Sequence, residues 1–232
     1  MSTLEPEPSP SEAPPAGRVE AADALRRLGH ALVGHRADAG VVARITDFAI
    51  AVLPEVERAP RRTQAERFTG DERFLGAFLS PGSQPVLAEG ESMDLFSDSV
   101  VSGSANPMGI ALRIRREGDE AVARVTLGHA FQGAPGRAHG GIVSAIVDEV
   151  MGSVMPILGR VAFTRTLSIT YLAPTPMGEE IEFRARLRER DGRRLHIECE
   201  GTHAGARFVE CEGLFVEVDL AAFRGAEETG AP

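Results

Sequence analysis

Residues 134–152 constrain the fold of this chain more than any other segment. They read APGRAHGGIVSAIVDEVMG, a glycine-rich turn that leads directly into an amphipathic helix. His139, Gly140 and Gly141 stand at the expected helix start, where unpaired N–H groups and partial positive charge can hold an anion or a developing oxyanion. Asp148 stands in the apolar middle, where a carboxylate is costly unless it is paired or used. Oxyanion donors and a carboxylate are two of the parts that acyl transfer needs.

The spacing between these two parts predicts how the protein assembles. Gly140 and Asp148 are separated by about 12 Å along a helix. One carbonyl cannot lie about 3 Å from a donor at Gly140 and also be attacked beside Asp148 of the same helix. If both residues act on one bond, the second must come from another chain. The spacing then predicts a two-fold dimer in which Gly140 of one subunit lies near Asp148 of the other.

Composition excludes several classes of protein. The formal net charge of −9 and the lack of a basic run argue against a nucleic-acid partner. The first residues have neither the basic nor the apolar region of a secretory signal, and charges interrupt each apolar run that could cross a bilayer. Two cysteines do not make a disulfide framework, and the histidines show no metal-ligand spacing. We therefore expect a soluble cytoplasmic protein with no membrane partner and no metal.

Composition and the pattern of apolar residues divide the chain into four parts. We expect a disordered tail over 1–18, a helical and irregular extension over 19–105, a domain over 106–219 and a second disordered tail over 220–232. Apolar stripes in the extension predict two helices between residues 19 and 57, separated at 34–40 and packed as a hairpin. A further short helix is expected around 72–79.

The domain has the pattern of an α+β fold. Alternating runs at 109–115 and 120–127, joined by a Glu-Gly-Asp turn, predict a hairpin. A helix is expected from His139 to about Met155, ending near Pro156. Four further strands are expected at 162–171, 180–189, 194–200 and 207–218. A single helix inserted in an otherwise antiparallel sheet should pack across one face of that sheet.

This element order and the His-Gly-Gly start of the helix resemble the hotdog fold, in which a curved antiparallel sheet wraps one long central helix. More narrowly, residues 106–219 resemble the PaaI-like (phenylacetic acid degradation) branch of hotdog acyl-CoA thioesterases. The segments that carry the resemblance are FQG at 131–133, HGG at 139–141, Asp148, TRTLSITY at 164–171 and APTP at 173–176. The resemblance implies an acyl-CoA substrate, no bound cofactor, and homodimers or dimers of dimers with sites at the subunit interface. The extension is not covered by it.

The resemblance also implies roles for single residues. Asp148 would activate water or attack the thioester itself, Gly140 would supply the oxyanion N–H, and Thr164 would steady the attacking water. Gln132 is the nearest amide that could polarise the thioester carbonyl, although it stands seven residues before His139, where many relatives have six. The alternative is a non-catalytic acyl-CoA-binding or regulatory hotdog protein, which the acid at position 148 disfavours.

Each of these residues also has a structural interpretation. His139 is more simply a helix cap than a catalytic group, and Gly140 and Gly141 could serve a tight turn. Thr164 could be an ordinary strand threonine. Glu149 lies about 100° round the helix from Asp148, so both acids cannot face one pocket.

Two further patterns lie on the later strands. Arg184, Arg186 and Arg188 share one strand face and could bind the phosphates of coenzyme A, or could form a solvated face that keeps the sheet soluble. Cys199 and Cys211 are symmetric about a turn near Gly205, which makes them candidate cross-strand neighbours. Reduced buried thiols are the simpler expectation for them, and a disulfide is the alternative.

Overall fold

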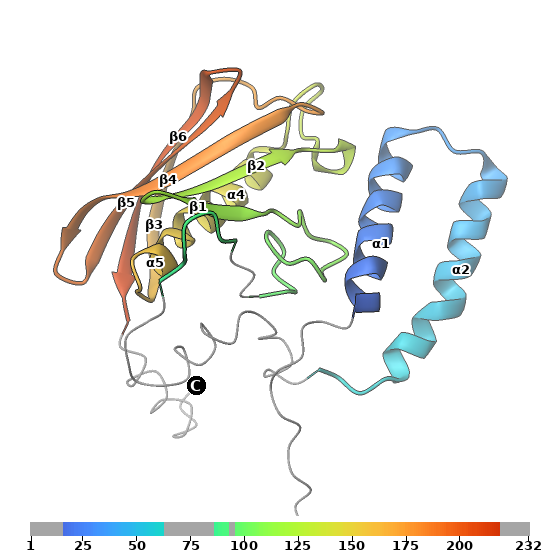
Figure 1. The fold of residues 1–232 in the computed structure, drawn as a ribbon. Helices are drawn as coiled ribbons and strands as arrows, with labels where there is room; N and C mark the ends of the chain where they lie inside the picture. Colours follow the sequence, from blue (N-terminus) through green and yellow to red (C-terminus); the bar gives the residue numbers. More distant parts are fainter. Residues whose placement is uncertain (1–15, 63–85, 93–95, 219–232) are drawn as a thin grey trace, which may run out of the picture.

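The structure is a computed structural model that describes residues 16–62, 86–92 and 96–218. Its six strands form a single antiparallel sheet in the order β1-β2-β4-β5-β6-β3 (Figure 1). The strands are β1 (Ile114–Glu117), β2 (Glu120–Thr126), β3 (Ala162–Tyr171), β4 (Glu180–Asp191), β5 (Arg194–His203) and β6 (Ala206–Glu217). The long strand β3 and the short strand β1 are therefore the two edges of the sheet.

The core lies between this sheet and the central helix α4 (Gly140–Gly152). The helix turns one apolar face to the sheet; its buried residues are Val143, Ile146, Val147, Val150 and Met151. They meet the inward residues of the strands, among them Phe183 and Phe215, which are at most 1% exposed. This is the α+β hotdog arrangement that the element order predicted, with one helix across one face of an antiparallel sheet.

The turns between the later strands follow their sequence signals. Gly192 has φ +58° between β4 and β5, and Ala204 and Gly205 have φ +48° and +78° between β5 and β6. Positive φ at the turn is what short hairpins with right-handed strand twist require. On β4, Ile181, Phe183 and Ala185 are buried while Arg186 is exposed, so the predicted alternation is confirmed.

Two predicted boundaries were wrong. The run 109–115 is not a strand along its length, because β1 begins only at Ile114. Ala111 has φ +56°, and the N–H groups of Ile110 and Leu112 donate to carbonyls at 100 and 101 instead of to β2. The central helix also ends earlier than expected, at Gly152, and the separate turn α5 (Val154–Ile157) includes Pro156. Proline is tolerated there because the first turn of a helix has no N–H partner to lose.

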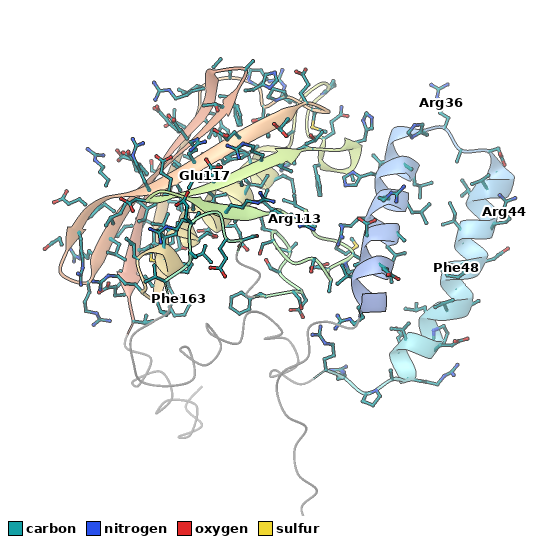
Figure 2. The ribbon with its side chains drawn as sticks, viewed as in Figure 1. Arg36, Arg44, Phe48, Arg113, Glu117 and Phe163 are labelled. Carbon is teal, nitrogen blue, oxygen red and sulfur yellow. The ribbon has the colours of Figure 1, made fainter. Side chains whose placement is uncertain are left out.

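The extension contains the two expected helices, α1 (Ala16–Gly34) and α2 (Ala39–Arg58), with Asp38 capping the second. The helix α1 begins within the expected tail and lies beside the 3-10 turn η2 (His129–Phe131) of the domain. The helix α2 has no buried residue and stands away from the sheet, with Arg44 and Phe48 on it (Figures 1 and 2), so the predicted packing of the two helices as a hairpin was wrong. The further helix expected at 72–79 lies outside the described residues.

One expectation about apolar runs needs correction. The stretch Gly140–Ile157 has the length and composition of a membrane span, since it carries only two acids in 18 residues. More than half of it, 56%, is buried within the protein. Its apolar character is accounted for by its packing against the sheet, as in the core helix of a globular domain.

Candidate active site

The acid on the central helix contacts the hydroxyl on the edge strand. Thr164 Oγ1 donates to Asp148 Oδ1 at 2.9 Å. Asp148 is half-buried, and Thr164 is exposed beside a register shift in the pairing of β3 with β6 between Thr164 and Thr166. Such an irregularity re-aims side chains at the edge of a sheet. The carboxylate is therefore fixed by one hydrogen bond, with its second oxygen available to a water or a substrate.

At the start of the same helix, the backbone N–H groups of Gly140 and Gly141 differ in their hydrogen bonding. His139 is the N-cap residue, and its Nδ1 accepts the N–H of Gly141 at 3.0 Å. The N–H of Gly140 donates to none of the residues that the structure describes. A helix N-terminus with an unbonded N–H is a site for a developing oxyanion. His139 thus has the capping role, and the N–H of Gly141 is not available to a ligand.

Tyr171 is a site residue to which the sequence analysis gave no role. Its hydroxyl, at the end of β3, donates to the Gly140 carbonyl at 2.9 Å and lies 2.6 Å from Ser144 Oγ. Ser144 Oγ also donates to the Gly140 carbonyl, at 3.0 Å. The side chains of Tyr171 and Ser144 therefore connect the first residue of α4 to the strand that carries Thr164. A signal was present in the sequence, because Tyr171 is the one tyrosine of the chain.

The candidate amide Gln132 lies near the helix start through its backbone. It forms an isolated antiparallel bridge with Ala138, two residues before Gly140. Its side chain is exposed and has no hydrogen bond to the residues that the structure describes. The structure therefore places Gln132 in the loop of the oxyanion donor without giving its amide a partner.

The second acid of the helix faces different surroundings. Glu149 accepts from Ser99 Oγ at 3.3 Å and from Ser102 Oγ. Both serines belong to the stretch before β1, so Glu149 connects α4 to the extension. Asp148 instead faces β3, in agreement with the 100° step between adjacent helical residues.

Comparisons with known proteins give the family and the fold to which this domain is similar. Residues 135–210 match the model of the thioesterase superfamily. A crystal structure of a thioesterase-superfamily protein is 25% identical and superposes with a TM-score of 0.68, covering 89% of this chain and 98% of that one. Residues 135–210 are therefore similar to the thioesterase superfamily, and the chain has the hotdog fold.

Curated relatives extend the comparison. Mouse acyl-coenzyme A thioesterase THEM4 is 32% identical over 91 residues, which are 38% of this chain and 39% of the relative. The bovine THEM4 is 28% identical over 171 residues, which are 72% of this chain and 66% of the relative. The matched part of the chain thus spans about two fifths of the mouse relative and just under two thirds of the bovine one.

The arginine stripe of β4 is paired with glutamates. Arg184 contacts three of them at 2.6–3.0 Å, Arg186 contacts two at 2.5–3.1 Å, and Arg188 contacts one at 2.6 Å. The hydrogen bond with Glu182 is the largest cause of the raised pKa of Arg184. The same bond lowers the pKa of Glu182. Arg184 and Arg186 line a cavity of about 330 Å³. Four glutamates also line it: Glu198, Glu200, Glu210 and Glu212. A phosphate there would meet acids as well as arginines, so the solvated-face interpretation fits better.

The two cysteines are direct cross-strand partners on β5 and β6, as predicted. Both are buried free thiols. Burial raises the pKa of Cys211 to about 11 and raises that of Cys199 further. Burial disfavours the thiolate form of both cysteines, and a thiol that stays protonated is a poor nucleophile. The described residues include no cluster of histidines, cysteines and acids that could hold a metal.

Proposed function

We propose that this protein hydrolyses an acyl-CoA thioester to the free acid and coenzyme A. The observation that carries the proposal is the contact between Asp148 and Thr164 at 2.9 Å, on the helix whose first N–H, at Gly140, bonds none of the described residues. A held carboxylate and an unbonded oxyanion donor are the two groups that acyl transfer to water needs. The thioesterase-superfamily match and the similarity to acyl-CoA thioesterases support the same reaction.

The chemistry follows from what these groups can donate and accept. Thr164 holds one oxygen of Asp148, and the other oxygen takes a proton from a water as that water attacks the thioester carbonyl. The N–H of Gly140 binds the oxyanion of the tetrahedral intermediate. Collapse of the intermediate breaks the carbon–sulfur bond, and the proton held by Asp148 passes to the departing thiolate. The products are the acid and the CoA thiol.

A second route uses the same atoms. Asp148 attacks the carbonyl directly, CoA leaves, and water hydrolyses the resulting mixed anhydride. Label in Asp148 after a single turnover in ¹⁸O-labelled water would establish this second route, because only attack of water on the Asp148 carbonyl of the anhydride leaves label in that side chain. Attack on the acyl carbonyl, or direct attack of water, places the label in the product only.

The active site is proposed to be shared between two copies of the chain. Asp148 and Gly140 of one helix are about 12 Å apart, too far to act on one carbonyl. The strand β3, which carries Thr164, is a sheet edge ten residues long, and Phe163, Tyr171 and Leu172 near its ends are each 48% exposed. A long uncovered edge is a template for pairing with another strand. Pairing of β3 with its copy in a homodimer, or in a dimer of dimers, would bring the helix start of one subunit toward Asp148 of the other.

The direct test of the activity is Asp148→Asn, which keeps the shape of the side chain and removes the base. We expect kcat for CoA release to fall at least about a hundredfold, while acyl-CoA binding survives. Glu149→Gln is the matched control, because the amide oxygen still accepts from Ser99 and Ser102. Short, medium, long and aryl acyl-CoAs should be assayed with the wild-type protein. Binding of all of them without turnover would replace the proposal with a non-catalytic acyl-CoA-binding protein.

A further inference from the structure

A helix of the extension lies directly against the turn that precedes the oxyanion loop. The His30 ring of α1 meets the Phe131 ring of η2 edge-on, with centroids 4.8 Å apart and planes at 76°. His30 Nδ1 accepts the N–H of Ala130 at 3.1 Å. The approach is close, since a Cβ added to Gly128 would lie 2.7 Å from His30 Nδ1, and one added to Gly34 would lie 2.5 Å from the His129 ring. Glycine is needed at both positions for this contact.

Backbone hydrogen bonds connect η2 and the loop after it to the start of α4. The Phe131 carbonyl accepts the N–H of His139 at 2.9 Å, and the N–H of Gly133 donates to the Arg137 carbonyl at 3.0 Å. A Cβ added to Gly133 would lie 2.8 Å from the Cα of His139, so the two ends of this loop are in close contact. His139 is the residue immediately before Gly140. The position of the Gly140 N–H therefore depends on where η2 is held.

The helix α1 has its own attachment to the domain, separate from η2. Arg26 Nη1 donates to the carbonyls of Ser104 and Asn106 at 3.0 and 2.7 Å, and the Arg26 side chain is 11% exposed. Ala22, one turn earlier, is 2% exposed. Charge-assisted hydrogen bonds at a mostly buried guanidinium are strong. The helix is thus fixed at Ala22 and Arg26, and it presents His30 to η2 from that fixed position.

From these contacts we infer that His30 is a positioning residue for the oxyanion hole, acting through Ala130 and Phe131 on the loop that ends at His139 and Gly140. The inference rests on the proposed function. The 3-10 turn has three residues and no fully buried side chain; Phe131 packs partly buried against the core, and His30 adds a contact to its ring and a hydrogen bond to Ala130. An oxyanion donor is useful only when it is held within about 0.5 Å of its productive place. The extension thereby becomes part of the catalytic apparatus without touching substrate.

The test compares three variants. His30→Leu keeps a side chain against Phe131 and removes the acceptor for the Ala130 N–H. His30→Asn restores an acceptor at about the place of Nδ1. His35→Leu is the control, because His35 lies at the exposed end of the same helix and bonds only the Ala31 carbonyl.

We expect His30→Leu to lower kcat for CoA release roughly ten- to hundredfold, as small misplacements of catalytic groups do, with KM within about twofold of wild type. His30→Asn should regain most of the activity, and His35→Leu should match wild type. All variants should show wild-type circular dichroism. Wild-type kcat in His30→Leu, or an equal loss in His35→Leu, would overturn the inference.

A second readout does not depend on turnover. Amide hydrogen exchange in peptides covering residues 129–142 should quicken in His30→Leu and return toward wild type in His30→Asn. If the wild-type protein shows no thioesterase activity, the proposed function fails, and the exchange data still decide whether His30 orders this loop. Unchanged exchange in His30→Leu would remove the positioning role.

Discussion

Nδ1 of His139 accepts the N–H of Gly141 at 3.0 Å, whereas the N–H of Gly140 bonds no residue in the described part of the chain. His139 acts here as a cap, so a residue that caps equally well should replace it. We predict that His139→Asn retains thioesterase activity within about threefold, whereas His139→Ala lowers the free energy of unfolding by about 1 kcal/mol. Urea unfolding and CoA-release assays check this. A large loss of activity in a stably folded His139→Asn would assign the imidazole a chemical role.

Tyr171 offers a prediction about binding. Its hydroxyl bonds the Gly140 carbonyl at 2.9 Å, and the chain has one tyrosine and no tryptophan, so Tyr171 dominates its intrinsic fluorescence. Binding of an acyl-pantetheine, which lacks the absorbing adenine, should change that fluorescence in the Asp148→Asn protein. Emission that stays constant at saturating ligand would place the bound thioester away from the Gly140 end of the helix.

Removing the Tyr171 hydroxyl tests whether its hydrogen bond to the Gly140 carbonyl helps to position the oxyanion donor. We predict that Tyr171→Phe lowers kcat several-fold, because Gly140 loses one of the two side-chain donors to its carbonyl. KM should change less than kcat. Ser144→Ala should behave similarly, since it removes the other donor, and a wild-type kcat in both variants would contradict this support.

His30 predicts a dependence of stability on pH. Burial first, and the charge of His129 second, lower its pKa below the ordinary 6.5. Because the folded pKa is below the unfolded one, the stabilisation by neutral His30 is fully present above about pH 6.5 and is lost as the pH falls through the folded pKa. Protonation also converts Nδ1 from acceptor to donor toward the Ala130 N–H.

The measurement is urea unfolding of the wild type and of His30→Asn between pH 5 and 8. The wild type should lose more stability on acidification than the variant does. The other charged groups at this contact, His129 on η2 and Arg26 one turn away on α1, are common to both proteins. Parallel pH profiles would show that His30 does not titrate in the contact.

We predict that the arginine stripe (Arg184, Arg186 and Arg188) does not contribute to substrate binding. Arg186 is already paired with Glu120 and Glu198 at 3.1 and 2.5 Å. Arg186→Gln should leave KM for acyl-CoA within about twofold of wild type, since two glutamates already engage the Arg186 guanidinium. A several-fold rise of KM for acyl-CoA, but not for an acyl-pantetheine without the nucleotide phosphates, would restore the stripe as a phosphate site.

The parts of the fold that the sequence predicted are those set by local pattern. The alternation on β4, the glycine turns at 192 and 205, and the apolar face of α4 each follow from residues a few positions apart. The contact of Thr164 with Asp148 spans 16 residues and was expected only through the resemblance to hotdog thioesterases.

Other features depend on contacts that no local pattern encodes. His30 and Ala130 are 100 residues apart, and nothing in the periodicity of either segment indicates the other. The run 109–113 alternates like a strand, yet the N–H groups of Ile110 and Leu112 bond residues 100 and 101. The arginines of β4 likewise look available in the sequence, because all of their glutamate partners except Glu182 come from other strands, β1, β2, β5 and β6.

The shared active site is the central claim, and two inactive variants test it together. Asp148→Asn removes the base. Gly140→Pro removes the oxyanion N–H at the first position of α4, where proline is well tolerated, and the preceding His139 has φ −68° and ψ 131°, as a residue before proline should. Each variant alone should be folded and inactive, as circular dichroism, sizing and CoA-release assays would show.

Mixed dimers then decide the claim. When the two chains are co-expressed with different tags and purified through both, one of the two sites in the mixed dimer carries both lesions and the other carries neither. The activity per dimer should therefore return to about half that of the wild type, since separate sites act independently to a first approximation. A mixed dimer as inactive as its parents would contradict an active site built from Gly140 of one subunit and Asp148 of the other.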